Sequence, residues 1–135
     1  MTTPKSILSR VLFLMYLGAI ALLCFISGEK IPDIQREIFG IPTDKLVHFF
    51  MFLPFPVLSY MAWDHKGRNA WGPVKFFFGN LLAGACLAAL TEWIQDMLPT
   101  RSMDLHDFWA DMLALGLASL FVFIIDITHI SSRRN

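Results

Sequence analysis

The sequence predicts an all-α, polytopic membrane protein that forms a single domain over residues 1–135 and contains four transmembrane helices. Two observations lead to this fold class. Hydrophobic residues make up 56% of the chain and charged residues only 16%, a balance typical of membrane domains. The apolar residues also gather in four runs, and each run extends toward the roughly 20 residues that a helix needs to cross a bilayer.

Each apolar run predicts one helix. The runs cover residues 11–27, 46–63, 76–91 and 112–125, and with their flanks they predict helices over residues 7–27, 45–63, 73–98 and 104–127. A soluble helical bundle would show polar positions at the 3.6-residue helical spacing, but the first run is apolar on all sides. A signal peptide is the other interpretation of that run. No small-residue cleavage site follows Cys24, which favours a retained helix.

Prolines mark the ends and irregularities of these helices. Pro99 stops the third helix, because proline cannot continue the helical hydrogen-bond pattern. Pro54 and Pro56 fall inside the second helix, and we expect them to kink it. Residues 28–43 combine prolines and a glycine with several isoleucines, which predicts an amphipathic segment lying at the membrane interface.

The positions of lysine and arginine predict the orientation of the chain, since positively charged loops stay in the cytoplasm. One side of the predicted membrane carries seven of them: Lys5, Arg10, Lys66, Arg68, Lys75, Arg133 and Arg134. The other side carries four: Lys30, Arg36, Lys45 and Arg101. We therefore expect both termini to be cytoplasmic.

With that topology, three polar segments meet on the outer side. They are "TDKLVH" at the start of the second helix, "EWIQD" at the end of the third and "RSMDLHDFWAD" at the start of the fourth. Asp44 and His48 are one helical turn apart, and Asp104, Asp107 and Asp111 form one acidic stripe at helical rotation. A stripe of this kind is costly against lipid, so we expect it to face the interior of the bundle and form a single site.

The same residues resemble the VanZ-like family of small bacterial membrane proteins. The matching positions run from Asp44 to about Gly116: Asp44, Lys45, His48 and Phe49, then Glu92 and Gln95, then Pro99, Arg101, Ser102 and Asp104, then Asp107 and Ala110. The sequence departs from the pattern at Asp111, where the family usually has asparagine, and at Ala114, where glycine is common. The resemblance implies a four-helix protein of the bacterial inner membrane and cell envelope, with a link to resistance against the glycopeptide teicoplanin.

The predicted site suits a phosphorylated lipid or lipid-like headgroup, which the protein would bind or modify. Helix amino ends, the Arg101 guanidinium and the Lys45 ammonium attract phosphate, while His48 and Glu92 offer acid–base catalysis. The predicted catalytic residues are His48 and Glu92, and the predicted substrate-binding residues are Asp44, Lys45, Gln95, Arg101, Asp104, Asp107 and Asp111.

The predicted partners and cofactor follow from the same charges. We expect membrane lipids as partners, including a lipid-linked envelope precursor or a lipoglycopeptide. A divalent cation (Mg²⁺, Mn²⁺ or Ca²⁺) would let the acids face a phosphate, because hard cations prefer oxygen ligands. The net charge of +0 gives no overall field for nucleic acid, so no nucleic-acid partner is expected.

Structural roles are the alternative for the same residues. Asp104 and Asp44 can cap their helices, Glu92 and Arg101 can form an ion pair between the third and fourth helices, and His48 can be an interior histidine bonded to Glu92 or Asp107. The protein would then be a non-enzymatic interaction protein or a small transporter, with the cluster as a structural ion network or a solute site. The sequence leaves open whether the protein is an enzyme.

Overall fold

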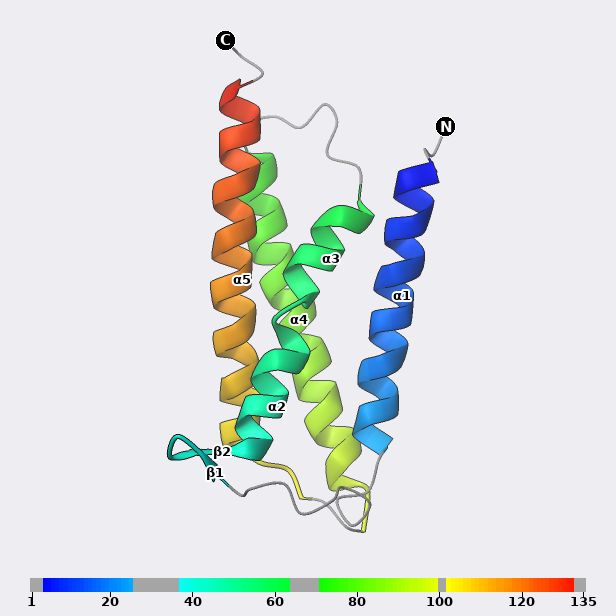
Figure 1. The fold of residues 1–135 in the computed structure, drawn as a ribbon, viewed down its shortest axis with the longest axis vertical. Helices are drawn as coiled ribbons and strands as arrows, with labels where there is room; N and C mark the ends of the chain where they lie inside the picture. Colours follow the sequence, from blue (N-terminus) through cyan, green and yellow to red (C-terminus); the bar gives the residue numbers. More distant parts are fainter. Residues whose placement is uncertain (1–3, 26–36, 64–70, 100–101, 133–135) are drawn as a thin grey trace.

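The computed structural model describes residues 4–25, 37–63, 71–99 and 102–132. Within these residues the fold is all-α apart from one two-stranded hairpin, and four segments are long and apolar enough to cross a membrane (Figure 1). The helices are α1 (Pro4–Phe25), α2 (Thr43–Phe52), α3 (Phe55–Ala62), α4 (Gly72–Asp96) and α5 (Leu105–Ser132). The predicted polytopic fold is confirmed, with α2 and α3 sharing the second span.

The second span is broken at its prolines. α2 ends with the bond from the Leu53 N–H to the Phe49 carbonyl at 3.0 Å, and the Leu58 N–H donates to the Pro54 carbonyl at 2.9 Å at the start of α3. Pro54 and Pro56 carry no N–H, so the helical series of backbone hydrogen bonds lacks two donors between these two bonds. The predicted kink is confirmed, and it divides the span into two helices that differ in direction (Figure 1).

The other helix ends lie within a few residues of their predicted positions. α4 ends at Asp96 rather than residue 98 and is followed by a turn that leads to Pro99. α5 continues to Ser132, beyond the predicted end at residue 127. Of the added residues 128–132, Ile130 is apolar.

A short β-hairpin precedes α2. β1 (Glu37–Ile38) pairs antiparallel with β2 (Ile41–Pro42), and the tip residues Phe39 and Gly40 have φ of 54° and 78°. Two consecutive left-handed residues are the geometry that a two-residue hairpin turn requires. Residues 28–36 of the predicted interfacial segment lie outside the described residues, so its placement at the interface stays a prediction.

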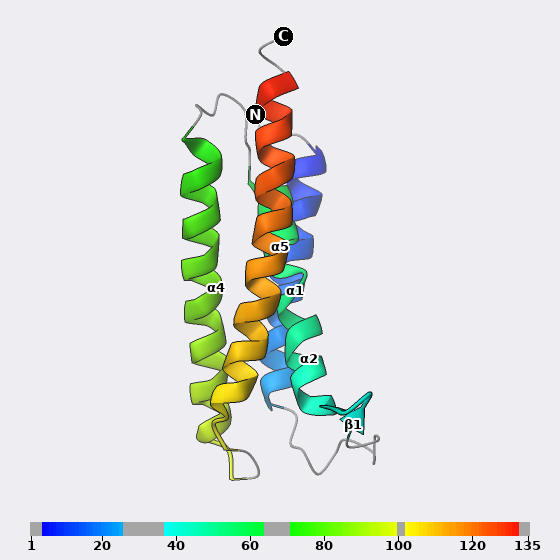
Figure 2. The same cartoon turned by 90° about the vertical axis from the view of Figure 1, so that its left-hand side faces the viewer.

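The helices pack in a bundle, and all five of them contribute buried residues to its core. α4 and α5 lie side by side, α2 packs on α5, and α3 packs on α1 (Figures 1 and 2). Phe13, Phe52, Phe55 and Leu115 are buried at these contacts. Many large apolar side chains on the outside of the bundle are exposed, as expected for helices that face lipid.

The two ends of the bundle differ in what they contain. The start of α1 and the end of α5 lie at one end, while the start of α2, the end of α4 and the start of α5 lie at the other (Figure 1). The polar segments singled out in the sequence therefore lie at the same end. The cytoplasmic location of the termini stays a prediction, because the structure contains no membrane.

Candidate functional site

A group of buried ionisable side chains lies at the end of the bundle opposite the start of α1 and the end of α5. α2 contributes His48, α4 contributes Glu92, and α5 contributes Asp107 and Asp111. We call these four residues the His48 cluster. The exposed fraction of each residue is 9% or less, although all four carry ionisable groups. Buried ionisable residues in a membrane protein are costly, so the cluster is a candidate functional site.

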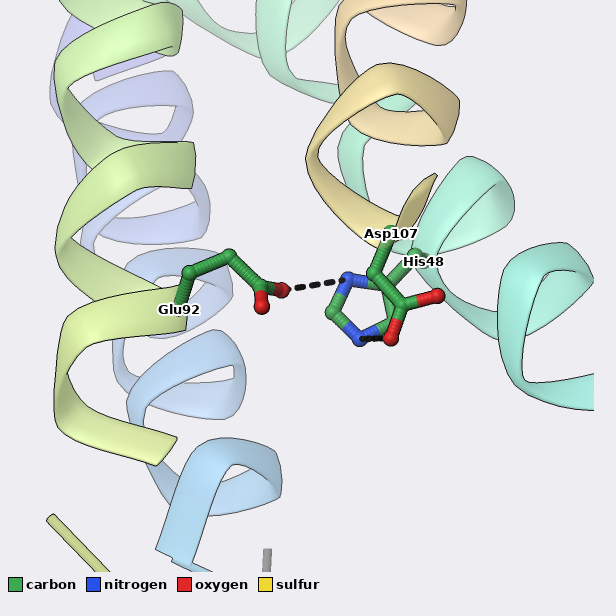
Figure 3. A group of neighbouring side chains, drawn as sticks. All are labelled: His48, Glu92 and Asp107. Carbon is green, nitrogen blue, oxygen red and sulfur yellow. Dashed lines mark ion pairs between the residues drawn. The ribbon is translucent and has the colours of Figure 1, made fainter. Parts of the chain in front are cut away.

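His48 is the centre of the cluster. Its Nδ1 lies 3.2 Å from Oδ1 and 3.3 Å from Oδ2 of Asp111. An ionised carboxylate only accepts hydrogen bonds, so opposite ionised Asp111 the Nδ1 atom carries the proton and donates. Figure 3 shows the imidazole between the other two carboxylates: Nδ1 is 3.7 Å from Oε1 of Glu92, and Nε2 is 3.7 Å from Oδ2 of Asp107. The predicted partners Glu92 and Asp107 are thus neighbours of His48, and its hydrogen bond goes to Asp111.

Glu92 is held by only one of its two carboxylate oxygens. Oε2 accepts a hydrogen bond from the backbone N–H of Asp104 at 3.0 Å, which ties the end of α4 to the start of α5. Oε1 is buried and has no hydrogen-bond partner among the described residues. The residue is 1% exposed, so burial removes this oxygen from water, and none of the residues in the described ranges donates a hydrogen bond to it.

Lys45 bridges α2 to the start of α5. Its Nζ donates to Oδ2 of Asp104 and to Oδ1 of Asp107, both at 3.0 Å, and to Oδ2 of Asp44 at 3.3 Å. Three carboxylates thus surround one ammonium group. Lys45 is therefore engaged by protein carboxylates rather than presented as a free cation to a phosphate.

Asp104 caps α5, as the alternative interpretation predicted. Its Oδ1 accepts the backbone N–H of His106 at 2.8 Å, and the His106 ring Nδ1 lies 3.0 Å from the same oxygen. The pKa of Asp104 is held well below its usual range, first by the backbone N–H of His106 and then by the Lys45 ammonium. Asp104 is therefore ionised at neutral pH.

The remaining predicted site residues differ in their placement. Asp44 lies in the first turn of α2, where its exposed carboxylate contacts Lys45. The N-cap position of α2 is Pro42, and no side chain forms a capping hydrogen bond there. The prediction that Asp44 caps this helix is therefore wrong. Gln95 is buried near the end of α4, on the turn that follows Glu92. Arg101, and with it the predicted Glu92–Arg101 ion pair, lies outside the described residues.

Two groups of side chains have donor atoms close enough to share one metal ion. One donor atom from each of His48, Glu92 and Asp107 lies within 4.8 Å of the other two, and the same holds for Asp44, Asp104 and Asp107. The first group is buried and includes an imidazole. In the second group, Lys45 Nζ donates to all three carboxylates and so already supplies the positive charge.

Sequence reasoning missed two polar pairs deeper in the bundle. Ser59 Oγ donates to Oδ1 of Asn80 at 2.8 Å, and Tyr60 Oη donates to Oδ1 of Asp126 at 3.1 Å. Asn80 and Asp126 are single polar residues in long apolar runs, which is the signal that could have found them. Each pair joins two different helices, and no sequence pattern shows which helices those are.

Comparison with known proteins gives distant matches. No family model matches the chain, and no solved structure matches it. The chain is 28% identical over 118 residues to Transmembrane 9 superfamily member 1 of Bos taurus, and 26% identical over 118 residues to the proteins of that name from Mus musculus and Pongo abelii. Each match covers 78% of this chain and 19% of the other protein. The chain therefore spans about a fifth of the length of these relatives.

These findings correct the family prediction. The predicted VanZ-like family is wrong, because no family model matches and the curated proteins that the chain resembles are mammalian transmembrane proteins. The predicted link to teicoplanin resistance rested on that resemblance alone, so it has no support. The mammalian relatives also give no support to a bacterial inner membrane. A multi-pass membrane protein is what the fold and the similarity support.

Proposed function

We propose that this multi-pass membrane protein uses the His48 cluster to bind and act on the phosphorylated headgroup of a lipid at one membrane surface. The cluster lies where α2 begins, α4 ends and α5 begins. The ends of spanning helices meet the lipid headgroups at this depth. A ligand with a polar head and apolar tails suits the position.

The single observation that carries the proposal is the buried oxygen of Glu92 that has no hydrogen-bond partner in the part of the chain that the structure describes. Networks that only hold helices together satisfy their buried polar atoms, because an unmade buried hydrogen bond is costly. Oε1 of Glu92 is buried, receives no hydrogen bond from the described residues and points toward His48 (Figure 3). A ligand group that carries a hydrogen-bond donor would satisfy this oxygen, which supports a ligand site over a purely structural network.

The residues around Glu92 support acid–base chemistry on such a ligand. His48 and Glu92 can each take up or release a proton, and Asp111 holds the imidazole by its Nδ1. Hydrolysis or transfer at a phosphorylated headgroup needs groups of this kind beside the reacting oxygen. Arg101 precedes Asp104 by three residues in the sequence, and its role in holding the phosphate stays a prediction.

An apolar groove on α2, lined by none of the four residues of the His48 cluster, supports a lipid over a soluble ligand. It has a volume of about 540 Å³ and lies beside the start of α2. Residues from α1, the hairpin and α2 line it, including Leu23, Ile38, Val47 and Phe50. A groove with this lining suits part of an acyl chain whose headgroup lies at the membrane surface.

A structural ion network is the second candidate, and Lys45 favours it. Its ammonium links α2 to the start of α5 through Asp104 and Asp107. If the whole cluster had this role, neutralising Glu92 would change stability and leave bound lipid unchanged.

The two candidates are separated by the lipids that co-purify with the protein in mild detergent. We would compare wild type, Glu92→Gln and the control Asp126→Asn by mass spectrometry, with helical content and thermal unfolding measured on the same samples. A headgroup site predicts that a phosphorylated lipid is depleted about tenfold in Glu92→Gln, which corresponds to the loss of one charge-assisted contact. The control should retain that lipid. Identical lipid profiles in folded wild type and Glu92→Gln would reject the headgroup site and favour the structural network.

A further inference from the structure

We propose that His48, Glu92 and Asp107 bind a single divalent metal ion. The three side chains come from three different helices, and the two carboxylates lie on either side of the imidazole (Figure 3). Metal binding by these residues does not depend on the headgroup proposal, since it concerns the side chains of the chain alone.

The spacing of the donor atoms fits one shared ion. His48 Nε2 and Asp107 Oδ2 are 3.7 Å apart, which is longer than a hydrogen bond. Two ligand atoms on the same ion, each bonded at about 2.0–2.2 Å, lie roughly 3–4 Å apart. One donor atom of each of the three residues lies within 4.8 Å of the others, so a small inward movement of the side chains completes the set.

Both carboxylates are fixed through one oxygen and leave the other toward the imidazole. Glu92 Oε2 accepts the Asp104 N–H, while Oε1 is buried, has no hydrogen-bond partner among the described residues and lies 3.7 Å from the His48 ring. Asp107 Oδ1 accepts from Lys45, while Oδ2 lies 3.7 Å from the other ring nitrogen. This division of roles positions one oxygen of each residue for a ligand and holds its direction with the other.

Asp111 selects the nitrogen of His48 that would bind the ion. Because Nδ1 donates its proton to Asp111, Nε2, which faces Asp107, keeps its lone pair free for a metal. Glu92 Oε1 lies beside Nδ1, so the Glu92 carboxylate would turn toward Nε2 to bind the same ion. Asp111 is fully buried, so no water competes for this hydrogen bond. A carboxylate that bonds to a ligating histidine is a common feature of protein metal sites, and it fixes the ring while raising the basicity of the ligating nitrogen.

The excess of negative charge around His48 also favours binding of a cation. Glu92, Asp107 and Asp111 surround one imidazole. Of these three carboxylates, Asp107 forms an ion pair with Lys45. Three carboxylates packed together repel one another in a poorly solvated site. A divalent cation between them would attract each carboxylate and offset their mutual repulsion.

The donor types indicate which ion. Imidazole suits Zn²⁺ and other first-row transition ions, whereas carboxylates suit Mn²⁺ as well as Mg²⁺ and Ca²⁺. A set of one imidazole and two carboxylates therefore favours Mn²⁺ or Zn²⁺ over Ca²⁺. Such an ion would also attract phosphate, which would reconcile an acidic site with an anionic headgroup.

The test is to titrate chelator-treated, detergent-solubilised protein with Mn²⁺ or Zn²⁺ and measure binding by calorimetry, with Mn²⁺ also followed by electron paramagnetic resonance. Wild type should bind one ion per chain. Glu92→Gln and Asp107→Asn, which keep side-chain size, should weaken binding about ten- to a hundredfold or more. Asp44→Asn changes the neighbouring carboxylate group, and Asp126→Asn changes a buried carboxylate farther along α5, so both should bind as wild type does.

Several outcomes would overturn the proposal. Absence of one-to-one binding in folded wild type would do so, as would equal weakening in Asp44→Asn and Glu92→Gln. Helical content measured on every sample identifies a variant that fails to fold, and the wild-type titration still decides in that case. Metal binding without lipid retention would reject only the headgroup proposal, and lipid retention in protein that binds no metal would reject only the metal site.

Discussion

His48 on α2 and Asp111 on α5 are 63 positions apart in the chain, yet the imidazole Nδ1 lies 3.2 Å from the Asp111 carboxylate in the interior of the bundle. This contact orients the ring so that Nε2 faces Asp107. It therefore connects the packing of two helices to the chemistry of the candidate site.

The first prediction concerns Asp111→Asn. The amide oxygen can still accept from Nδ1, so the ring keeps its orientation while the negative charge behind it is lost. We expect the affinity for Mn²⁺ or Zn²⁺ to fall about ten- to a hundredfold, as for other carboxylates that support a metal-bound histidine. Calorimetric titration measures this change. Asp126→Asn removes a buried carboxylate from the same helix and serves as the control, and an equal affinity in Asp111→Asn and wild type would show that Asp111 does not support a metal ligand.

The second prediction concerns Lys45→Met. The methionine keeps most of the apolar side chain but leaves Asp107 and Asp104 without their ammonium partner. Because Asp107 is largely buried, we expect the free energy of unfolding to fall by about 1–3 kcal/mol. Thermal or denaturant unfolding followed by circular dichroism in detergent measures the loss.

Two further variants test whether that loss comes from the pairing. Lys75→Met removes a lysine from an exposed position on α4 and should change stability little. Adding Asp107→Asn to Lys45→Met removes both charges, so the double variant should lose less than the sum of the single losses. Additive losses would mean that Lys45 and Asp107 are not energetic partners.

The third prediction concerns pH. The folded-state pKa of Asp104 lies below its unfolded value of about 3.9, so the ionised carboxylate stabilises the folded state above that pH. This contribution is lost as the pH falls below about 4 toward the folded pKa. Asp104→Asn retains a side-chain oxygen for the cap but removes the charge. The stability gap between wild type and Asp104→Asn should therefore be present at pH 7 and narrow below about pH 4.

The groups that face Asp104 define the controls for this pH series. They are the Lys45 ammonium on α2, the His106 ring on α5, and Glu92 on α4, which accepts the Asp104 N–H. Chelator in every buffer removes any effect of bound metal on Glu92. His106→Gln should leave most of the Asp104 effect in place, because the backbone N–H of residue 106 and the Lys45 ammonium are unchanged. A gap that stays constant from pH 7 to pH 3 would contradict the assigned role of the Asp104 charge.

The spans and the end of the bundle that carries the site could be predicted from the sequence. Apolar runs of membrane length predict spanning helices, and alternation of direction brings the start of α2, the end of α4 and the start of α5 to one end. Pro54 and Pro56 predicted the break in the second span, because the missing N–H groups are a property of the residue itself.

The contacts within the site could not be predicted in the same way. His48 meets Asp111 because of how α2 and α5 are rotated against each other, and that rotation depends on packing throughout the bundle. The family resemblance misled for a related reason. Asp104 and Pro99 are helix-end signals that many pairs of consecutive helices share, so matches at such positions carry less information than their number suggests.

The last prediction concerns the close approach of α4 and α5. A Cβ placed on Gly84 would lie 2.6 Å from Cδ2 and 2.8 Å from Cδ1 of Leu115. Leu115 is fully buried, so its side chain has little room to move away. We expect Gly84→Ala to lower the free energy of unfolding by about 1–3 kcal/mol, the usual cost of overpacking a core. Because Glu92 lies two turns further along α4, the same variant should also weaken metal binding if the helices separate.

Two variants distinguish overpacking from a general effect of replacing glycine. Gly79→Ala lies on the same helix with nothing within 4 Å of the added methyl group, so it should be neutral or slightly stabilising. Combining Gly84→Ala with Leu115→Ala removes the clashing side chain, and the added methyl group then fills part of the space that leucine leaves. The double variant should therefore lose less than the sum of the two single losses in unfolding measurements. Equal behaviour of Gly79→Ala and Gly84→Ala would show that α4 and α5 are not packed closely at this point.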